Sequence, residues 1–144
     1  MKTLYIIVLL FLGGTVCAQQ NVDEILASND VNSGKSEQVL LASQFQEMNA
    51  ETLDGVYKLV SENGKLTEVR TFEQGKLDGT WLQYDENEHL IAIANYKNDQ
   101  KHGKWIIWDS NGVKRVEMLY EQGQRTGTWN AWNEEGKLIS SKAY

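Results

Sequence analysis

The sequence predicts an all-β protein: an extended antiparallel β-hairpin repeat, laid out as a single-layer meander of four 24-residue units. Two observations predict this fold. The chain contains no proline, so no residue is prevented from donating to a β-ladder. Glycines also recur every 24 residues, and two residues after each stands an aromatic residue. These glycines are Gly55, Gly79, Gly103 and Gly127.

Each unit has the pattern of a hairpin. A first strand starts at the aromatic residue, as in Trp105–Trp108, and a return strand follows, as from Leu66 to Phe72. Between them lies Asn-Gly or an equivalent pair, which favours a two-residue turn or a three-residue turn with a left-handed glycine. The sequence does not separate these two loops. The predicted turn glycines are Gly55, Gly64, Gly79, Gly103, Gly112, Gly127 and Gly136.

Alternation along the first strand predicts two apolar faces. Trp105 and Ile107 share one face, while Ile106 and Trp108 share the other. Large side chains on both faces favour a single extended sheet in which each unit contacts its neighbours. A closed barrel is the alternative.

The chain divides into three segments. Residues 1–18 resemble a signal peptide. They contain the basic residue Lys2, an apolar run shorter than the ~20 residues that cross a bilayer, and small residues that fit a cleavage site after Ala18. Residues 19–52 are polar, with a possible capping strand or helix, and residues 53–144 form the repeat domain. We therefore expect an exported protein, periplasmic or secreted. A lipoprotein is less expected, because Val16 precedes Cys17.

The repeated segments resemble a known family. The run from Tyr96 to Trp105 is similar to the core of a MORN (membrane occupation and recognition nexus) repeat, as are Tyr120 through Trp129 and Phe72 through Trp81. The 24-residue spacing and the Trp-x-x-Trp pattern look most like the YwqK-like antitoxin repeat.

This resemblance implies a β-hairpin array used as a protein-interaction surface, and some members are thought to neutralise a toxin. The sequence departs from the pattern at Glu88 and Asp99, where glycines are expected, which leaves open a distortion of the second unit. If the alignment holds, Glu88 occupies a left-handed position, and glycine there would relieve its strain. The predicted signal peptide is a further departure from the family, because a typical antitoxin acts in the cytoplasm and an exported protein leaves it.

The sequence offers little for catalysis or cofactors. His89 and His102 lie in different turns without the clustered partners of a zinc site. Asp54 and Asp78 precede repeat glycines, but the equivalent residues in the later units are not acidic, which marks a turn position rather than an acid–base pair. A net charge of −6 disfavours nucleic acid as a partner. We expect no enzyme activity, no cofactor, no metal and no transmembrane segment in the mature chain.

The aromatic residues of the first strands are the candidate binding residues. They could form a ladder that binds a partner protein, stacks on sugars, or supplies packing alone. The leading hypothesis is a protein-interaction module; the alternatives are a carbohydrate- or envelope-binding protein and an immunity-type antitoxin. The partner's identity and the oligomeric state stay open. The candidate ladder is Tyr57, Trp81, Tyr84, Trp105, Trp108, Trp129 and Trp132.

Overall fold

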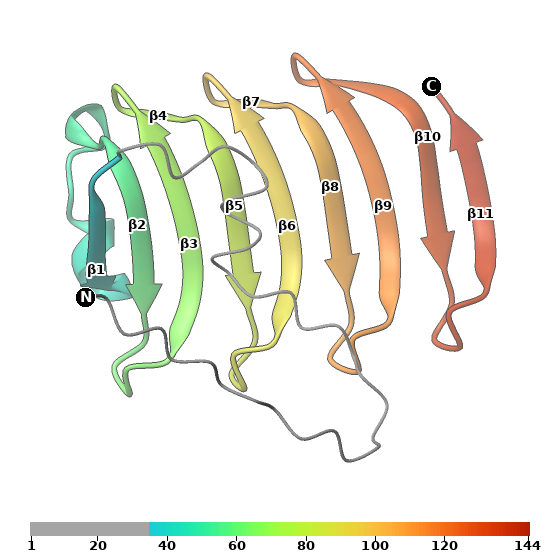
Figure 1. Cartoon of the computed structure of the whole chain (residues 1–144), viewed down its shortest axis with the longest axis horizontal. Coiled ribbons are helices and arrows are strands. Elements are labelled where there is room, and N and C mark those ends of the chain that lie inside the picture. The colour runs from blue at the N-terminus through green and yellow to red at the C-terminus, as the bar shows by residue number, and fades with distance from the viewer. Residues whose placement is uncertain (1–34) are drawn as a thin grey trace, which may run out of the picture.

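The fold is one open sheet of hairpins, as predicted (Figure 1). The computed structural model describes residues 35–144, so the predicted signal peptide and its cleavage site lie outside the described residues. β1 and β11 form the two edges of the sheet, so the alternative prediction of a closed barrel is wrong. The strands are β1 (Glu37–Leu41), β2 (Gly55–Val60), β3 (Leu66–Glu73), β4 (Lys76–Leu77), β5 (Gly79–Tyr84), β6 (Leu90–Lys97), β7 (Gln100–Lys101), β8 (Gly103–Trp108), β9 (Lys114–Glu121), β10 (Gln124–Trp132) and β11 (Leu138–Ala143).

The tip of each hairpin is a three-residue turn that ends in a left-handed residue. In the first unit the Ser61 N–H donates to the Lys65 carbonyl over 2.9 Å, and the Gly64 N–H donates to the Ser61 carbonyl over 2.8 Å. This geometry decides between the two loops that the sequence allowed. The left-handed residues have φ of 79° at Gly64, 62° at Glu88, 76° at Gly112 and 73° at Gly136.

Beyond each tip, the return strand carries one extra residue. Leu59 pairs with Glu68 and Val60 pairs with Leu66, so Thr67 bulges out between them. Its hydroxyl donates to the Leu59 carbonyl over 3.0 Å. A bulge increases the local twist, and because it recurs in each unit the hairpins stack in one orientation. The equivalent residues are Ile91, Arg115 and Ile139.

A two-residue turn joins each unit to the next and is hydrogen-bonded to the residue at the start of its own unit. Gln74 and Gly75 have φ of 50° and 80°, the signs of a type I′ turn, which suits twisted strands. The Gly75 N–H donates to the Leu53 carbonyl over 2.7 Å. The bond recurs between Asp99 and Leu77 (2.9 Å) and between Gly123 and Lys101 (2.8 Å).

The second unit keeps this geometry despite its missing glycines. Asp99 has φ of 65° and Glu88 of 62°, so both take the left-handed conformation, as expected of Glu88. Each carboxylate also accepts a backbone N–H from a neighbouring strand: Asp99 from Leu77 over 2.7 Å and Glu88 from Leu66 over 2.9 Å. These bonds offset the strain, and the unit is not distorted.

A short N-terminal segment covers the first hairpin. β1 pairs in parallel with β2, and α2 (Ala42–Gln46) and η1 (Ala50–Thr52) follow it. The apolar residues of this segment therefore form both a strand and a helix. Phe45 of α2 packs against Tyr57 and Phe72, with ring centroids 5.6 and 6.0 Å apart. With Leu53 and Leu59 these rings make a buried cluster on one face of the sheet.

A second buried cluster lies on the opposite face and consists of Val56, Val69, Leu82 and Tyr84. Apart from Phe45 of α2, both clusters belong to the first two units. Within residues 35–144, the last buried residue is Ala94, and the later strands are partly or fully exposed. None of the helices in this part of the chain is long and apolar enough to span a membrane.

Candidate functional site

The first-strand aromatic residues divide between the two faces of the sheet. Trp105 pairs with Met118 and Trp108 pairs with Lys114, three residues apart on β8 and pointing in opposite directions. The seven predicted ladder residues therefore do not form one surface. Tyr57, Trp81, Trp105 and Trp129 lie on one face, named here the ladder face; Tyr84, Trp108 and Trp132 lie on the other.

On the ladder face, tyrosines of the return strands fill the gaps between the tryptophans. Tyr96 lies 5.9 Å from Trp81 and 5.2 Å from Trp105, measured between ring centroids. Tyr120 lies 5.4 Å from Trp105 and 5.0 Å from Trp129, and Tyr144 lies 4.8 Å from Trp129. The rings are tilted at separations that aromatic pairs prefer. The result is a continuous stack from Trp81 to Tyr144.

The sequence contained a signal for these tyrosines that the predicted ladder omitted. Phe72, Tyr96, Tyr120 and Tyr144 recur every 24 residues at the ends of the units. Their place in the stack depends on the register of neighbouring strands, because each tryptophan contacts tyrosines other than the residue with which it is paired in the sheet. That register cannot be obtained from spacing within one unit.

Hydrogen bonds hold the indole rings. The Trp105 N–H donates to the Asn95 carbonyl and the Trp129 N–H to the Leu119 carbonyl, each over 2.9 Å. The Asn95 carbonyl also accepts the His102 N–H over 2.9 Å, so the indole adds a second donor at a point where the pairing of β6 with β8 is interrupted. The tryptophans are therefore structural as well as partly exposed.

Cations lie over the stacked rings. The Lys101 ammonium is 4.4 Å from the Trp105 centroid and 5.1 Å from that of Tyr120. The Arg125 guanidinium carbon lies 4.7 Å from the Trp129 centroid and 5.3 Å from that of Tyr144. These distances are within the range of cation–π attraction. Lys101 and Arg125 are themselves 24 residues apart, a signal that the sequence analysis missed.

The charge of these cations is not neutralised by nearby carboxylates. Arg70, over Trp81, is paired with Glu68 at 2.7 Å. By contrast Lys101, Arg125 and Lys142 are exposed and form no ion pair within residues 35–144. Paired positions of the ladder face over β8 to β11 carry no acidic residue: they are Gly103, Trp105, Ile107, Val116, Met118, Tyr120, Arg125, Trp129, Ala131, Ser140 and Lys142.

The aromatic residues of the ladder face are buried in the first unit and accessible in the later ones. Phe45 covers Tyr57 and Phe72, both buried, whereas Tyr144 is 44% exposed. Ile107, also on the ladder face, is 40% exposed. Accessible aromatic surface on this face therefore begins at the second unit. Burial also raises the pKa of Tyr96, so its hydroxyl stays protonated.

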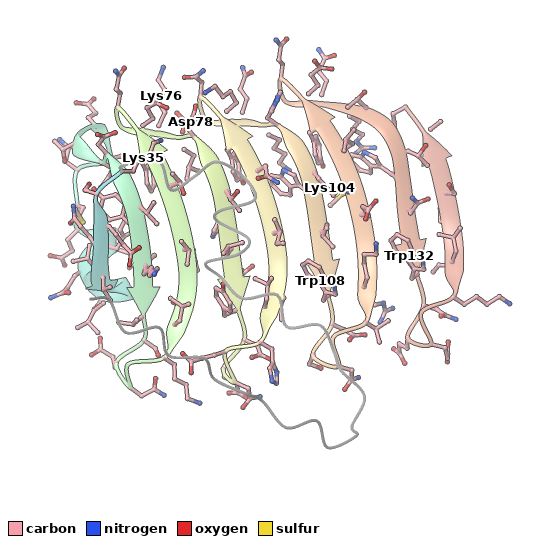
Figure 2. All side chains as sticks on the ribbon, in the orientation of Figure 1. Lys35, Lys76, Asp78, Lys104, Trp108 and Trp132 are labelled. Carbon is pink, nitrogen blue, oxygen red and sulfur yellow. The ribbon has the colours of Figure 1, made fainter. Side chains whose placement is uncertain are left out.

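The opposite face carries a more widely spaced set of aromatics. Trp108 and Trp132 lie near the hairpin tips of β8 and β10, whereas Lys104 lies nearer the other end of β8 (Figure 2). Lys114 lies between these two tryptophans, with its ammonium 4.6 Å from the Trp132 centroid. That ammonium also forms an ion pair with Glu117 at 2.9 Å, so its charge is neutralised within the chain.

The two aspartates that precede repeat glycines have structural partners. Asp54 accepts the Gln74 N–H over 3.2 Å, and Asp78 accepts the Asn98 N–H over 3.1 Å. Both carboxylates therefore hold the next two-residue turn. Asp78 also forms an ion pair with Lys97, and its hydrogen bond raises the pKa of that lysine. The described part of the chain contains no cluster of three residues that could hold a metal ion.

A family comparison agrees with this geometry. Three segments, residues 53–74, 77–98 and 101–122, match the model of the MORN repeat variant. The chain is therefore similar to the MORN repeat variant over three tandem segments. Each matched segment holds one hairpin and ends at the first residue of the two-residue turn after it, and β10 and β11 add a further hairpin of the same form. No curated protein and no solved structure is significantly similar to the chain.

MORN repeats are generally protein- or membrane-interaction modules and are typically non-catalytic. In this chain the described residues with accessible aromatic surface and unneutralised charge meet on the ladder face of the third and fourth units. That face is the candidate binding site.

Proposed function

We propose that this chain is an exported, non-catalytic interaction module that binds a partner protein through the ladder face. One observation carries the proposal: partly exposed rings and exposed, unpaired cations repeat together on one face. Tryptophan, tyrosine and arginine are the residues that dominate binding energy at protein interfaces. A fold stabilised by packing alone has no need of cations over its outer rings.

Site-directed crosslinking tests which face binds. A photoreactive residue replaces Ile107, which is exposed on the ladder face, or Val39, which is 62% exposed and pairs with Lys58 on the opposite face. We expect the Ile107 probe to give one defined protein adduct in the native host, which Ile107→Ser prevents in a competing chain. An adduct from Val39 alone would contradict the proposal.

Export is supported by the pattern of residues 1–18. Mass spectrometry of the protein from its native host should find an N-terminus at Gln19. A chain that keeps Met1, or one that carries lipid on Cys17, would contradict this part of the proposal.

Carbohydrate binding is the second candidate, because tilted indole rings on an open face suit the flat surfaces of sugars. It predicts retention on an immobilised neutral polysaccharide that does not depend on Lys101 or Arg125. The narrower hypothesis of a YwqK-like antitoxin rests on the Trp-x-x-Trp spacing. Trp105 and Trp108 point to opposite faces, so that spacing meets a need of the fold and adds no support for immunity.

A further inference from the structure

The ladder face has a repeat distance that restricts the shape of its ligand. Each unit contributes two strands, and neighbouring strands lie about 4.7–4.9 Å apart, so the site repeats every ~9.6 Å across the sheet. Each of the last two units presents one tryptophan, one tyrosine and one cation that touches both rings. A ligand that lies across the strands meets the same group at each step.

Among regular peptide conformations, polyproline II fits this repeat. It rises about 3.1 Å per residue with three residues per turn, so every third side chain points the same way at ~9.3 Å intervals. The mismatch is ~0.3 Å per unit. An extended strand repeats its face every ~6.7 Å, and an α-helix at seven residues repeats every ~10.5 Å and also rotates. Both lose register across consecutive units.

The charge of the ladder face determines which side chains its ligand should carry. Lys101, Arg125 and Lys142 are exposed, and the paired positions around them contain no carboxylate. The chain as a whole has a net charge of −6, so this face is an isolated basic region on an acidic protein. Anionic groups are attracted to it, while the rings favour proline.

We propose that the ladder face of the third and fourth units binds an acidic, proline-rich segment of a partner protein in the polyproline II conformation, with a carboxylate at every third residue. This inference rests on the proposed function and names the chemistry of the partner. One carboxylate meets Lys101, and the carboxylate three residues along meets Arg125. The intervening prolines contact Trp105, Tyr120 and Trp129.

A synthetic peptide of five Pro-Pro-Glu triplets tests the proposal, with tryptophan fluorescence as the signal. We expect saturable binding that weakens as salt rises, because the Debye length falls from ~10 Å at 0.1 M to ~3 Å at 1 M. The same peptide with glutamine in place of glutamate should bind at least tenfold more weakly. A peptide of the same composition with its glutamates in one block should also bind at least tenfold more weakly.

Matched variants locate the site. Lys101→Gln with Arg125→Gln should raise the Kd at least tenfold. Lys104→Gln with Lys137→Gln removes the same charge from an exposed residue on the opposite face and from one at the last hairpin tip, and it should change the Kd less than twofold. Lys101→Arg keeps both charge and stacking and should retain binding. Circular dichroism checks that each variant is folded.

The proposal is overturned if the blocked peptide binds as tightly as the triplet peptide, or if both double variants weaken binding equally. Binding of polygalacturonate or of phosphatidylglycerol vesicles without binding of the peptide also overturns it. If the triplet peptide fails while Ile107→Ser still prevents the partner adduct, this inference is wrong and the proposed function stands.

Discussion

The Glu88 carboxylate accepts the backbone N–H of Leu66 across the boundary between the first two units, at 2.9 Å. Glu88 is also left-handed, with φ of 62°, at a hairpin tip where the other units have glycine. Glu88 thus has a strained backbone conformation and also makes a hydrogen bond between two units. Glycine at this position therefore does not bring the simple gain that relief of strain implies.

We expect Glu88→Gly to change the free energy of unfolding by less than ~0.5 kcal/mol, because about 1 kcal/mol of relieved strain is offset by the lost hydrogen bond. Glu88→Ala loses the bond and keeps the strain, so it should destabilise by ~1–2 kcal/mol. The difference between these variants should equal the cost of Gly112→Ala, at the equivalent tip with φ of 76°. Urea melts measure all three, and unequal values would mean that the tips are not equivalent.

Gly75 and Gly123 test the packing of the N-terminal segment. Their φ values, 80° and 81°, are nearly identical, so alanine costs the same backbone strain at each, ~1 kcal/mol. A Cβ at Gly75 would also lie 2.9 Å from the Glu51 Cα in η1, whereas a Cβ at Gly123 has no atom within 4 Å. Gly75→Ala should therefore cost a further 1–3 kcal/mol in a chemical melt. Equal costs would mean that η1 does not pack on this turn.

The indole hydrogen bonds predict equal effects in two units. Trp105→Phe and Trp129→Phe each keep a ring in the stack but lose an N–H bond of 2.9 Å to a carbonyl on the adjacent strand. Each should destabilise the chain by ~0.5–1.5 kcal/mol. Thermal or urea melts check this value. A neutral Trp105→Phe would show that its bond does not stabilise the fold.

Two hairpin tips should respond to acid. The backbone N–H of His89 donates to the Asp85 carboxylate and lowers the pKa of that carboxyl below its ordinary value. Burial alone would raise the pKa of Asp109, but the N–H groups of Val113 and Asn111 and the Arg115 guanidinium together lower it. A lowered folded-state pKa means stability that is present above the unfolded pKa and is lost as pH falls through the folded value.

The expected result is a free energy of unfolding that falls as pH drops below ~4. Asp85→Asn with Asp109→Asn should flatten that fall, because asparagine accepts the same bonds without titrating. The fourth unit already uses Asn133 in this way, accepting the Glu135 and Lys137 N–H groups. Urea melts from pH 2 to 7 and carbonyl NMR titrations test it. If the double variant leaves the pH dependence of the free energy of unfolding unchanged, neither carboxylate contributes to the loss of stability in acid.

The units and their turns were predictable because left-handed positions select glycine or asparagine, and Gly64 and Gly112 mark them 48 residues apart, two units of the repeat. The two faces followed from alternation along each strand. The ladder's composition did not follow, because the contact of Trp105 with Tyr96 requires the register between β6 and β8. The parallel pairing of β1 is also non-local, and no periodicity within five residues indicates it.

The concentration of buried residues in the first two units gives the molecule two ends of unequal strength. Local opening should begin at β11 and β10, where amide hydrogen exchange is expected to be fast, and should reach β2 to β6 only on global unfolding. A ligand on the third and fourth units would then clamp the part of the chain that opens most easily. Binding would then be detected as slower amide hydrogen exchange in those strands, far from the buried clusters. The two ends of the sheet would differ in how much a ligand stabilises them.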